Sequence, residues 1–527
     1  MPQRAQTSLA GQCPADRIRS FAALAAGFAL LQGLGACVLN DRLDPALEVP
    51  RDYRAPHIRS EAAVPPLEWW RGFRSAELTD LIEQALAANF DIAAAVARIV
   101  QADAQARIAG AALLPTINGT ASVDRSKGST AVFSTGATNA GGGNTGGSGG
   151  TGGGGSSGGG AIGTTSSAGR ARTIYTVALN ASYQVDFWGR VRALIRAADY
   201  TSLASRFDRE VVALSTLVSL ANTYFLVLEG QDRLRVAREN LTSSERILKL
   251  IQDRFNQGTA SSLDVAQQAT LTAALRATIP PLVEQVEQNK AALALLAGRA
   301  PENLVIRGGS MFRLAIPQVS PGIPSELLTQ RPDIREAEMR LASADANVYA
   351  ARAAFLPNIQ LTGNAGFESA ALRTLFGPGA LFYSVAASLT QPIFQGGLLL
   401  GQLDLQKGAR EELLQDYRKT VISAFTDVER ALVAVQQTAR QEALQRQAEA
   451  EARRAFDLSE ERLRGGTIDL TVVLQTEQAL FQQQDLVAQA RFARLQAIVA
   501  LFQALGGGWF LDRTLVPPPP PAPADKT

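Results

Sequence analysis

A change of periodicity at a proline, present twice, is the strongest constraint on how this chain folds. Before Pro357, small or apolar residues follow heptad spacing: Ile334, Ala337, Leu341, Ala344, Val348, Ala351 and Phe355. After Pro357, apolar or small residues alternate with polar ones: Ile359, Leu361, Gly363, Ala365 and Phe367. Heptad spacing predicts a helix that packs along a seam, and alternation predicts a strand with one apolar and one polar face.

The same construction lies 242 residues upstream, around Pro115. Its helical seam consists of Ile92, Ala95, Ile99, Ala102, Ala106, Ala109 and Leu113. The strand that follows alternates Ile117, Gly119, Ala121 and Val123 with Asn118, Thr120 and Ser122. Two copies of one helix-to-strand unit indicate an internal two-fold repeat.

Further elements extend both copies. We expect one helix over residues 76–114, a second strand at Thr173–Phe187 and its counterpart at Phe382–Phe394. Long helices are predicted at about 190–255 and 398–464, with return helices at 262–296 and 470–505. A kink is expected at Pro280-Pro281, because proline removes a helical hydrogen bond.

One insertion distinguishes the two copies. Pro115 and Pro357 are 242 residues apart, whereas Gly189 and Gly397 are only 208 apart. The difference places extra residues between the first two strands, in a stretch rich in glycine, serine and threonine. Such a composition buries too little apolar surface to become ordered, so we interpret residues 136–170 as a floppy loop between strands.

Composition excludes several functional classes. The 51 basic and 49 acidic residues leave no charge surplus that would point to a nucleic-acid partner. The single histidine, His57, lies in a Pro-rich segment and has no second histidine for a metal cluster or a catalytic pair. Cys13 and Cys37 both lie near the N-terminus, which argues against a disulfide framework and a thiol enzyme. We therefore expect no catalytic residues, no cofactor and no metal site.

Residues 1–36 have the features of a lipoprotein signal peptide. Arginines precede the apolar run Phe21–Leu34, which is long enough for a signal sequence and short for a membrane-spanning helix. The run ends in Leu34-Gly35-Ala36-Cys37, which resembles a bacterial lipobox, so Cys37 is the predicted lipidation site and mature N-terminus. The alternative is an ordinary signal peptide with an incidental cysteine. By resemblance to bacterial lipoproteins, Val38 favours the outer membrane, where an acyl anchor holds the chain to lipid.

The mature chain divides into five segments by composition and repeat position. They are an extended Pro- and Arg-rich tether with a Trp69-Trp70 pair (37–74), the first repeat (75–300), a connecting segment (301–324), the second repeat (325–508) and a Pro-rich tail (509–527).

Four strands of about ten residues have the length needed to cross a bilayer when tilted. One chain cannot close a barrel from four strands, and an open sheet in lipid leaves backbone groups unsatisfied at several kcal/mol each. Chains must therefore pool their strands. Two chains give eight, whose interior is filled by side chains, whereas three give twelve and leave a water-filled lumen. The predicted fold class is an α+β membrane protein, in which a shared β-barrel continues into a tube of long helices.

The motifs resemble those of the outer-membrane factors of the TolC and OprM type, in particular the lipoprotein branch that serves resistance–nodulation–division efflux pumps. The most specific are Arg331-Pro332-Asp333-Ile334, Ala351–Pro357, Asp186-Phe187-Trp188-Gly189-Arg190, and the turn Arg254–Asp264. We interpret the first as a helix start and the third as a bend beside the membrane interface.

This resemblance implies a homotrimer with a twelve-stranded barrel in the outer membrane and a twelve-helix periplasmic tunnel. It further implies a passive exit duct for drugs, small toxic compounds or metal ions, working with a periplasmic adaptor protein and an inner-membrane pump. Two alternatives remain. One is the duct of a type I protein secretion system, and the other is a surface coiled-coil adhesin, against which two strand pairs at matching repeat positions argue.

The resemblance also implies a constriction near the two helical turns. Asp264 is the candidate gate residue of the first repeat, and its alternative role is to stabilise the first turn of a helix through the helix dipole. Where the family commonly has Leu-Leu-Asp-Ala-Gln, this chain has Val473-Leu474-Gln475-Thr476-Glu477. Gln475 therefore occupies the usual aspartate position, and Asp469 or Glu477 could supply the missing carboxylate.

Overall fold

The computed structural model describes residues 66–127, 171–319, 324–507 and 509 of the 527-residue chain. They divide into two compact units, and each is described by itself. The signal peptide, the predicted lipidation site Cys37, the Gly-rich loop 136–170 and nearly all of the Pro-rich tail lie outside the described residues.

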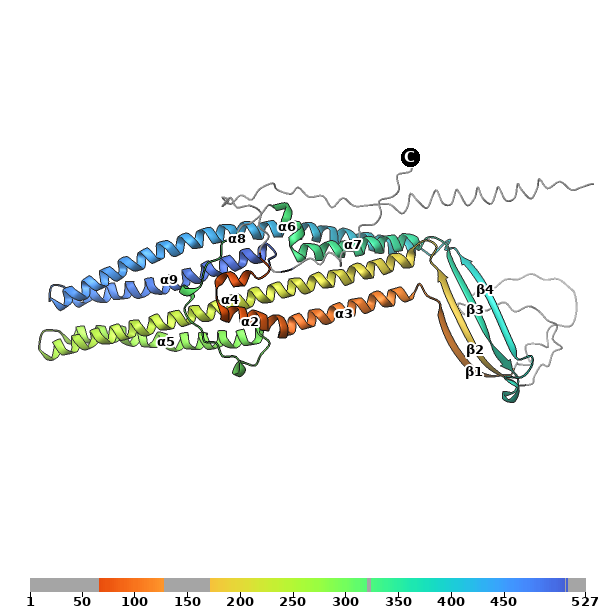
Figure 1. Ribbon diagram of the computed structural model, residues 1–527, viewed down its shortest axis with the longest axis horizontal. Helices are drawn as coiled ribbons and strands as arrows, with labels where there is room; N and C mark the ends of the chain where they lie inside the picture. Colours follow the sequence, from red (N-terminus) through yellow and green to blue (C-terminus); the bar gives the residue numbers. More distant parts are fainter. Residues whose placement is uncertain (1–65, 128–170, 320–323, 508, 510–527) are drawn as a thin grey trace, which may run out of the picture. The chain divides into compact units, whose positions relative to one another are not determined.

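The smaller unit is a four-stranded antiparallel sheet with the strands in chain order (Figure 1). The strands are β1 (Thr116–Ser126), β2 (Arg172–Val185), β3 (Asn358–Ser369) and β4 (Leu381–Thr390), with a short 3-10 helix at Leu372–Thr374. The two predicted strand pairs are joined directly, because β2 pairs with β3 over their full common length. One chain thus supplies a single continuous sheet.

Two strands end earlier than predicted. β2 stops at Val185 because the Asp186 carboxylate accepts hydrogen bonds from the backbone N–H groups of Val191 and Arg192, 3.0 Å each, at the start of the next helix. β4 stops at Thr390, before Pro392, which has no N–H group for the strand ladder. The predicted ends at Phe187 and Phe394 are therefore wrong.

The larger unit is helical. Its first half contains α2 (Ala76–Ala88), α3 (Phe90–Ala111), α4 (Arg190–Asn256) and α5 (Ser262–Leu296). Its second half contains α6 (Pro324–Gln330), α7 (Pro332–Ala353), α8 (Leu398–Arg464) and α9 (Leu470–Ala504), and 3-10 turns lie at Trp69–Phe73, Pro301–Asn303 and Met311–Arg313. Both long helices have 67 residues and both return helices have 35, and α4 and α8 begin 208 residues apart.

The single helix expected over residues 76–114 is divided at Asn89. Asn89 has extended backbone dihedrals, and its side-chain Oδ1 accepts from the N–H groups of Asp91 and Ile92 at 2.8 and 3.1 Å. Asparagine caps helix starts well because its short side chain satisfies these free donors. By contrast, α5 continues as one helix through Pro280 and Pro281.

The end of the predicted tether is not extended. Residues Trp69–Phe73 form a 3-10 helix whose aromatic side chains are buried in the main hydrophobic core. The Trp69 ring stacks on Phe502 at 5.2 Å between centroids, and Phe73 meets Phe225 edge-on at 5.1 Å. Aromatic rings contribute so much buried apolar area that this segment belongs to the core.

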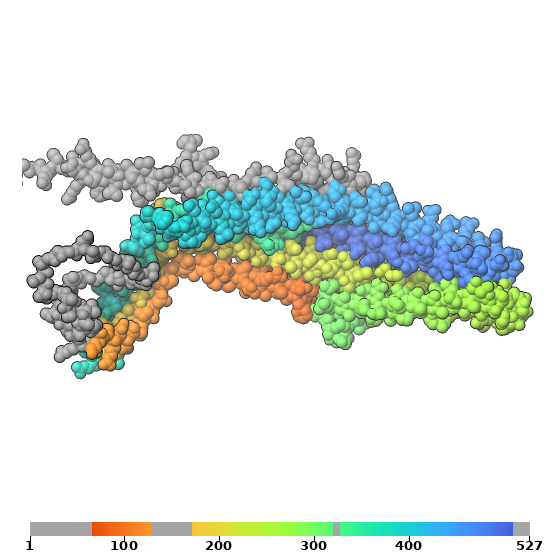
Figure 2. Space-filling view, turned by 180° about the vertical axis from the view of Figure 1, so that it is seen from behind, coloured from red at the N-terminus to blue at the C-terminus, as the bar shows by residue number. Residues whose placement is uncertain are grey.

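The two long hairpins, α4–α5 and α8–α9, lie against each other (Figure 2). Near their turns they share one apolar cluster with members from α4, α8 and α9: Ile247, Ile251, Phe456, Leu463, Leu470, Val473 and Leu480. This shared cluster packs the two hairpins together close to both turns, near the predicted gate residues.

Candidate functional site

One face of the sheet is apolar across all four strands. The pairing register sets Ile117 opposite Ala181, Ala181 opposite Gly363, and Gly363 opposite Val385, and neighbouring pairs continue the pattern. Large side chains on this face are exposed in the single chain, with Val385 at 84% and Leu179 at 61%. The predicted alternation is confirmed, and the register aligns it into a surface suited to lipid.

The opposite face carries small polar side chains that hydrogen-bond across the strands. Asn180 donates to Thr120 at 3.1 Å, Gln360 donates to Ser182 at 3.1 Å, and Ser384 donates to Asn364 at 2.7 Å. A sheet with one lipid-compatible face and one hydrated face is typical of the wall of an aqueous pore.

Strands β1 and β4 are the two edges of this sheet, and every residue of β1 is exposed. Each edge presents a row of N–H and C=O groups to whatever lies beside it. Because hydrocarbon offers no hydrogen-bond partner, both edges need another strand when the apolar face is in lipid.

Helices are weaker candidates for crossing the membrane, although residues Ala76–Ala111 and helix α4 each contain a window that is long and apolar enough. In α4, 61% of that window is buried inside the chain, as expected of a core helix. Helix α3 is joined to α4 by ion pairs of Arg98 with Asp208 and Arg206 with Asp103, at 2.8 and 3.2 Å. Ion pairs of this kind are typical of a helix that faces water rather than lipid.

The strand-to-helix junctions of the two repeats contact each other. The indole Nε1 of Trp188 donates a 2.8 Å hydrogen bond to the carbonyl oxygen of Pro357, the proline at which α7 gives way to β3. Gly189 beside it has φ of 76°, a conformation that favours glycine. The predicted bend into the helix at the Asp186–Arg190 motif is therefore present, and Trp188 also joins this junction to that of the second repeat.

At the other end of the helices, two equivalent turns join α4 to α5 and α8 to α9. Gly258 and Gly466 have φ of 75° and 69°, in the left-handed region. The N–H of Thr259 donates to Arg254 O at 2.9 Å, and the N–H of Thr467 donates to Arg462 O at 3.0 Å. Both α4 and α8 thus end in a glycine-containing C-terminal motif, so the two repeats share the same turn geometry and hydrogen bond.

Asp264, the first predicted gate residue, is half-exposed and forms a capping box with Ser261. Its Oδ2 accepts from the Ser261 N–H at 2.8 Å and from the Ser261 hydroxyl at 2.9 Å, while its own N–H donates to Ser261 Oγ at 3.2 Å. The alternative role at the helix start is therefore present in the single chain.

Asp469 and Gln475 are both exposed. Asp469 is the N-cap residue of α9, but its side chain makes no capping hydrogen bond. Within the described part of the chain, no ion pair or hydrogen bond joins Asp264, Asp469 and Gln475 to one another. Glu477, the other acidic alternative, is fully buried between the hairpins.

Arg254 is the first residue of the Arg254–Asp264 turn motif, and no role was predicted for it. Its Nη2 donates to the carbonyl oxygens of Leu463 and Arg464, at 2.6 and 3.2 Å. Close by, Arg246 of α4 pairs with Glu460 of α8 at 3.1 Å. These contacts link the α4–α5 hairpin to the α8–α9 hairpin close to both turns.

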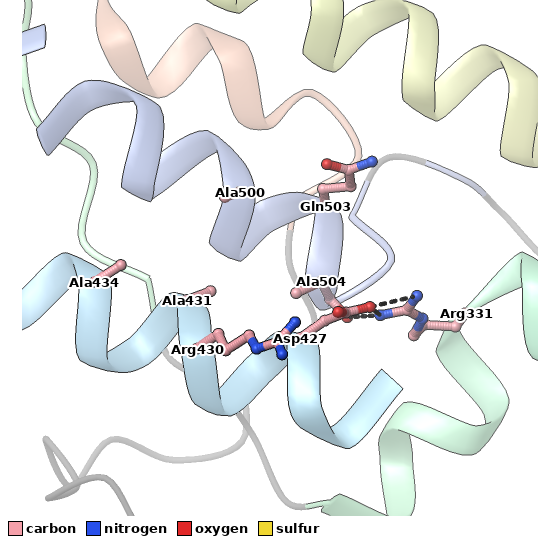
Figure 3. Close-up of a pocket in the computed structure, with 8 residues that line it drawn as sticks. All are labelled: Arg331, Asp427, Arg430, Ala431, Ala434, Ala500, Gln503 and Ala504. Carbon is pink, nitrogen blue, oxygen red and sulfur yellow. Dashed lines mark hydrogen bonds and ion pairs between the residues drawn. The ribbon is translucent and has the colours of Figure 1, made fainter. Parts of the chain in front are cut away.

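Arg331, in the predicted helix-start motif, lines a surface pocket of about 420 Å³ formed with residues of α8 and α9 (Figure 3). It pairs with Asp333 at 2.7 Å and Asp427 at 3.4 Å, and it donates to the Ala504 carbonyl at 3.0 Å. Burial opposes its charge, but the two carboxylates raise the pKa of the guanidinium above its ordinary value. Arg331 thus joins the start of α7 to α8 and to the end of α9.

A second buried charge cluster fixes the segment between the repeats. Glu442 of α8 accepts from Arg446, Arg494 and Arg491 at 2.6, 2.9 and 3.4 Å. Arg491 also donates to the carbonyl oxygens of Met311 and Leu314, at 3.4 and 2.8 Å. The cluster therefore ties the connecting segment to α8 and α9.

Comparison with known proteins identifies a match over both repeats. A profile of the outer membrane efflux protein family matches residues 81–299 and 323–507. The pyoverdine export outer membrane protein OpmQ of Pseudomonas aeruginosa is 38% identical over 483 residues, covering 91% of this chain and 96% of its own. The toluene efflux pump outer membrane protein TtgF of Pseudomonas putida is 32% identical over 454 residues, covering 86% and 88%.

Solved structures share the architecture. The open state of the Neisseria gonorrhoeae MtrE outer membrane channel superposes with a TM-score of 0.74 at 27% identity, covering 89% of this chain and 98% of MtrE. A membrane protein from Pseudomonas aeruginosa gives 0.77 at 28% identity, covering 89% of this chain and all of its own. The fold and its long hairpins are thus shared with channel proteins.

Proposed function

Because this chain belongs to the outer membrane efflux protein family, we propose that three copies form one exit duct, a twelve-stranded barrel in the outer membrane continued by a periplasmic tunnel of helices. The predicted family, the outer-membrane location and the role as channel component of an efflux system are confirmed by the family match and the relatives. The proposal adds the number of copies, the closed barrel and the direction of transport through it.

The sheet is the observation that carries this proposal. Its apolar face requires lipid, its polar face requires water, and its edges β1 and β4 require further strands. Eight strands from two copies would fill their own interior, whereas twelve from three copies leave a lumen. A lumen lined mainly by serine, threonine, asparagine and glutamine, with Asp124, Glu368 and Arg172 adding both charge signs, suits varied solutes better than one with a single charge sign.

Small molecules are the proposed substrates, namely drugs, small toxic compounds or metal ions. The relatives are named for export of pyoverdine and for efflux of toluene, so a shared duct that passes both polar and apolar small solutes fits their range. Selection and energy then come from partners, a periplasmic adaptor protein and an inner-membrane pump.

The N-terminus and the helical turns have further roles in the proposed duct. The signal peptide 1–36 is removed, and Cys37 is acylated to anchor the chain in outer-membrane lipid. Asp264, Asp469 and Gln475 lie around the periplasmic opening when three copies assemble. The equal helix lengths support two repeats, over residues 75–300 and 325–508.

The test is substrate accumulation in cells. In the strain that encodes this chain, with its other outer-membrane factors removed, the gene is deleted and restored as wild type or as Cys37→Ser. We expect deletion to raise accumulation of a fluorescent efflux dye several-fold, and wild type to restore it. Unchanged accumulation and drug susceptibility on deletion would contradict the duct. Loss of a secreted protein with unchanged accumulation would instead indicate type I secretion.

A further inference from the structure

A buried polar cluster lies between the two hairpins, within the apolar region near the turns. Its centre is the Glu477 carboxyl of α9, which is fully buried, as is Gln268 of α5. Gln268 Nε2 donates to Glu477 Oε2 at 3.3 Å and to Ser244 Oγ of α4 at 2.9 Å. The hydroxyls of Ser244 and Thr272 are 3.0 Å apart. Three helices therefore meet at one acidic side chain.

The charged groups around Glu477 do not neutralise it. Arg246 on α4 and Glu460 on α8 are the charges that influence it, and they pair with each other at 3.1 Å. Arg464 adds a second pairing to Glu460, at 2.6 Å. Helix α5 contacts the carboxyl through the uncharged Gln268 side chain. A buried carboxylate without a cation of its own is costly, whereas the neutral acid is not.

Two buried oxygens of the cluster lack a hydrogen-bond donor. Glu477 Oε1 and Gln268 Oε1 are both buried, and neither has a hydrogen-bond partner in the described part of the chain. If Glu477 is ionised, both oxygens can only accept hydrogen bonds, so neither can donate one to the other. Gln268 and Ser244 already hydrogen-bond the Glu477 carboxyl, and protonation adds a further donor to a cluster in which two buried acceptors have none.

We propose that Glu477 is protonated while the two hairpins are packed together, and that its ionisation favours a state in which α5 and α9 separate locally and water reaches the carboxylate. The packing of the hairpins near the turns is then controlled by pH. This concerns the folded chain itself and holds whatever solute the duct carries.

The electrostatics agree with this assignment. Burial raises the pKa of the Glu477 carboxyl from an ordinary value of 4.5 to about 7, with a contribution from Glu460, although hydrogen bonds from Gln268 and Ser244 and the charge of Arg246 oppose the rise. In the separated state the carboxyl regains its ordinary pKa. The packed state therefore binds the proton more tightly, and its advantage declines as pH rises from about 4.5 to about 7.

Hydrogen exchange measured by mass spectrometry on the full-length protein in detergent tests this. Wild type and Glu477→Gln, a neutral side chain of the same shape, are compared at pH 5 and pH 8, with labelling times corrected for intrinsic exchange. At pH 8 we expect segments 240–248, 262–275 and 470–482 to exchange about tenfold or more faster in wild type than in the variant. At pH 5 we expect the difference to shrink to a few-fold.

Glu449→Gln is the matched control, because Glu449 lies on α8 in an exposed i,i+4 pair with Arg453 at 2.8 Å. It should exchange like wild type at both pH values. Equal exchange of wild type and Glu477→Gln in these segments at both pH values would overturn the proposal. If the variant does not fold, wild type alone decides. In wild type, the exchange rate of these segments divided by that of α2 must rise between pH 5 and pH 8. A ratio that stays constant would overturn the proposal.

Discussion

The Arg254 guanidinium lies 2.6 Å from the carbonyl oxygen of Leu463 and so joins the ends of two helices that begin 208 residues apart in the sequence. Each helix end is already closed by its own glycine turn. Arg254 adds a link from the α4–α5 hairpin to the α8–α9 hairpin, at the end where the duct is proposed to narrow. Its cationic side chain also stabilises the negative end of the α8 dipole.

Arg254→Ala should loosen the two turns. The variant removes two hydrogen bonds from a charged donor, which we expect to cost about 1–2 kcal/mol of local packing. Spin labels at the exposed positions 257 and 467 should show a broader and longer distance distribution than in wild type. Arg453→Ala, which removes an exposed pair with Glu449, is the control and should leave the distribution unchanged. An unaltered distribution in Arg254→Ala would show that the link is not needed.

The two roles of Asp264 can be separated with its capping partner. Ser261→Ala breaks the capping box and should lower stability by about 1 kcal/mol without changing charge. Asp264→Asn removes the carboxylate. If three copies place Asp264 around the opening, only Asp264→Asn should lower the preference for cations in single-channel recordings.

Single-channel recordings of wild type, Ser261→Ala and Asp264→Asn are the measurement. The same ion preference in all three proteins would leave Asp264 with the capping role alone. Asp469→Asn and Gln475→Asp test the second repeat in the same recordings, and Gln475→Asp should increase cation preference.

Glu442→Gln should destabilise the helical unit by about 3 kcal/mol, because three arginines then surround a neutral side chain. Although burial works against it, hydrogen bonds from Arg494 and Arg446 and the charge of Arg491 lower the pKa of Glu442 below its ordinary value of 4.5. Its stabilising contribution is therefore present above pH 4.5 and is lost as pH falls below that value.

Thermal unfolding of wild type and Glu442→Gln between pH 7 and pH 3 checks this. The gap between the two midpoints should be largest near neutral pH and should close in acid. Glu239→Gln, which removes an exposed partner of Arg235, should stay within about 0.5 kcal/mol of wild type. A gap that is constant across the pH range would contradict the assignment.

Gly366→Ala should destabilise the sheet, because a Cβ atom there would lie 2.2 Å from the Val177 carbonyl oxygen and 2.6 Å from Ala178 Cα. Both contacts are with backbone, so β2 and β3 must separate, at about 1–3 kcal/mol. Gly363→Ala is the matched control, since its nearest neighbour, Ser384 O, would be 3.9 Å away. The thermal midpoint in detergent should fall for Gly366→Ala alone, and an equal fall in both variants would contradict this explanation.

The repeated periodicity was sufficient to predict most of the fold. Heptad spacing and alternation depend on side-chain hydrophobicity alone, and they located the strands and both long hairpins to within a few residues. The errors fall where one side chain decides the backbone. Asn89 caps a new helix start and so divides the predicted helix, and Asp186 ends a strand by capping the next helix. Trp69 is buried in the hydrophobic core, so the end of the predicted tether is not extended.

The candidate site was harder to predict because its key contacts are far apart in sequence. Asp264 was singled out by the resemblance to the family, and its capping partner Ser261 lies three residues before it in the sequence. Arg254 and Leu463 come from different repeats, as do Gln268 and Glu477, so no spacing rule connects them. Only the packing of the two hairpins brings these residues together.

The central claim is that edge strands β1 and β4 join neighbouring copies until three copies close a barrel. The direct measurement is disulfide cross-linking in native membranes, with Thr120→Cys on the polar face of β1 combined in turn with a cysteine at one of three β4 positions on the same face: Ser384, Ala386 and Ser388. A pair at Ser182 and Thr362, which face each other within one chain, is the control. We predict that at least one β1–β4 pair gives bands of two and three linked copies and none larger, whereas the control stays a single chain. Monomer alone in all three pairs, or a ladder beyond three copies, would contradict the account.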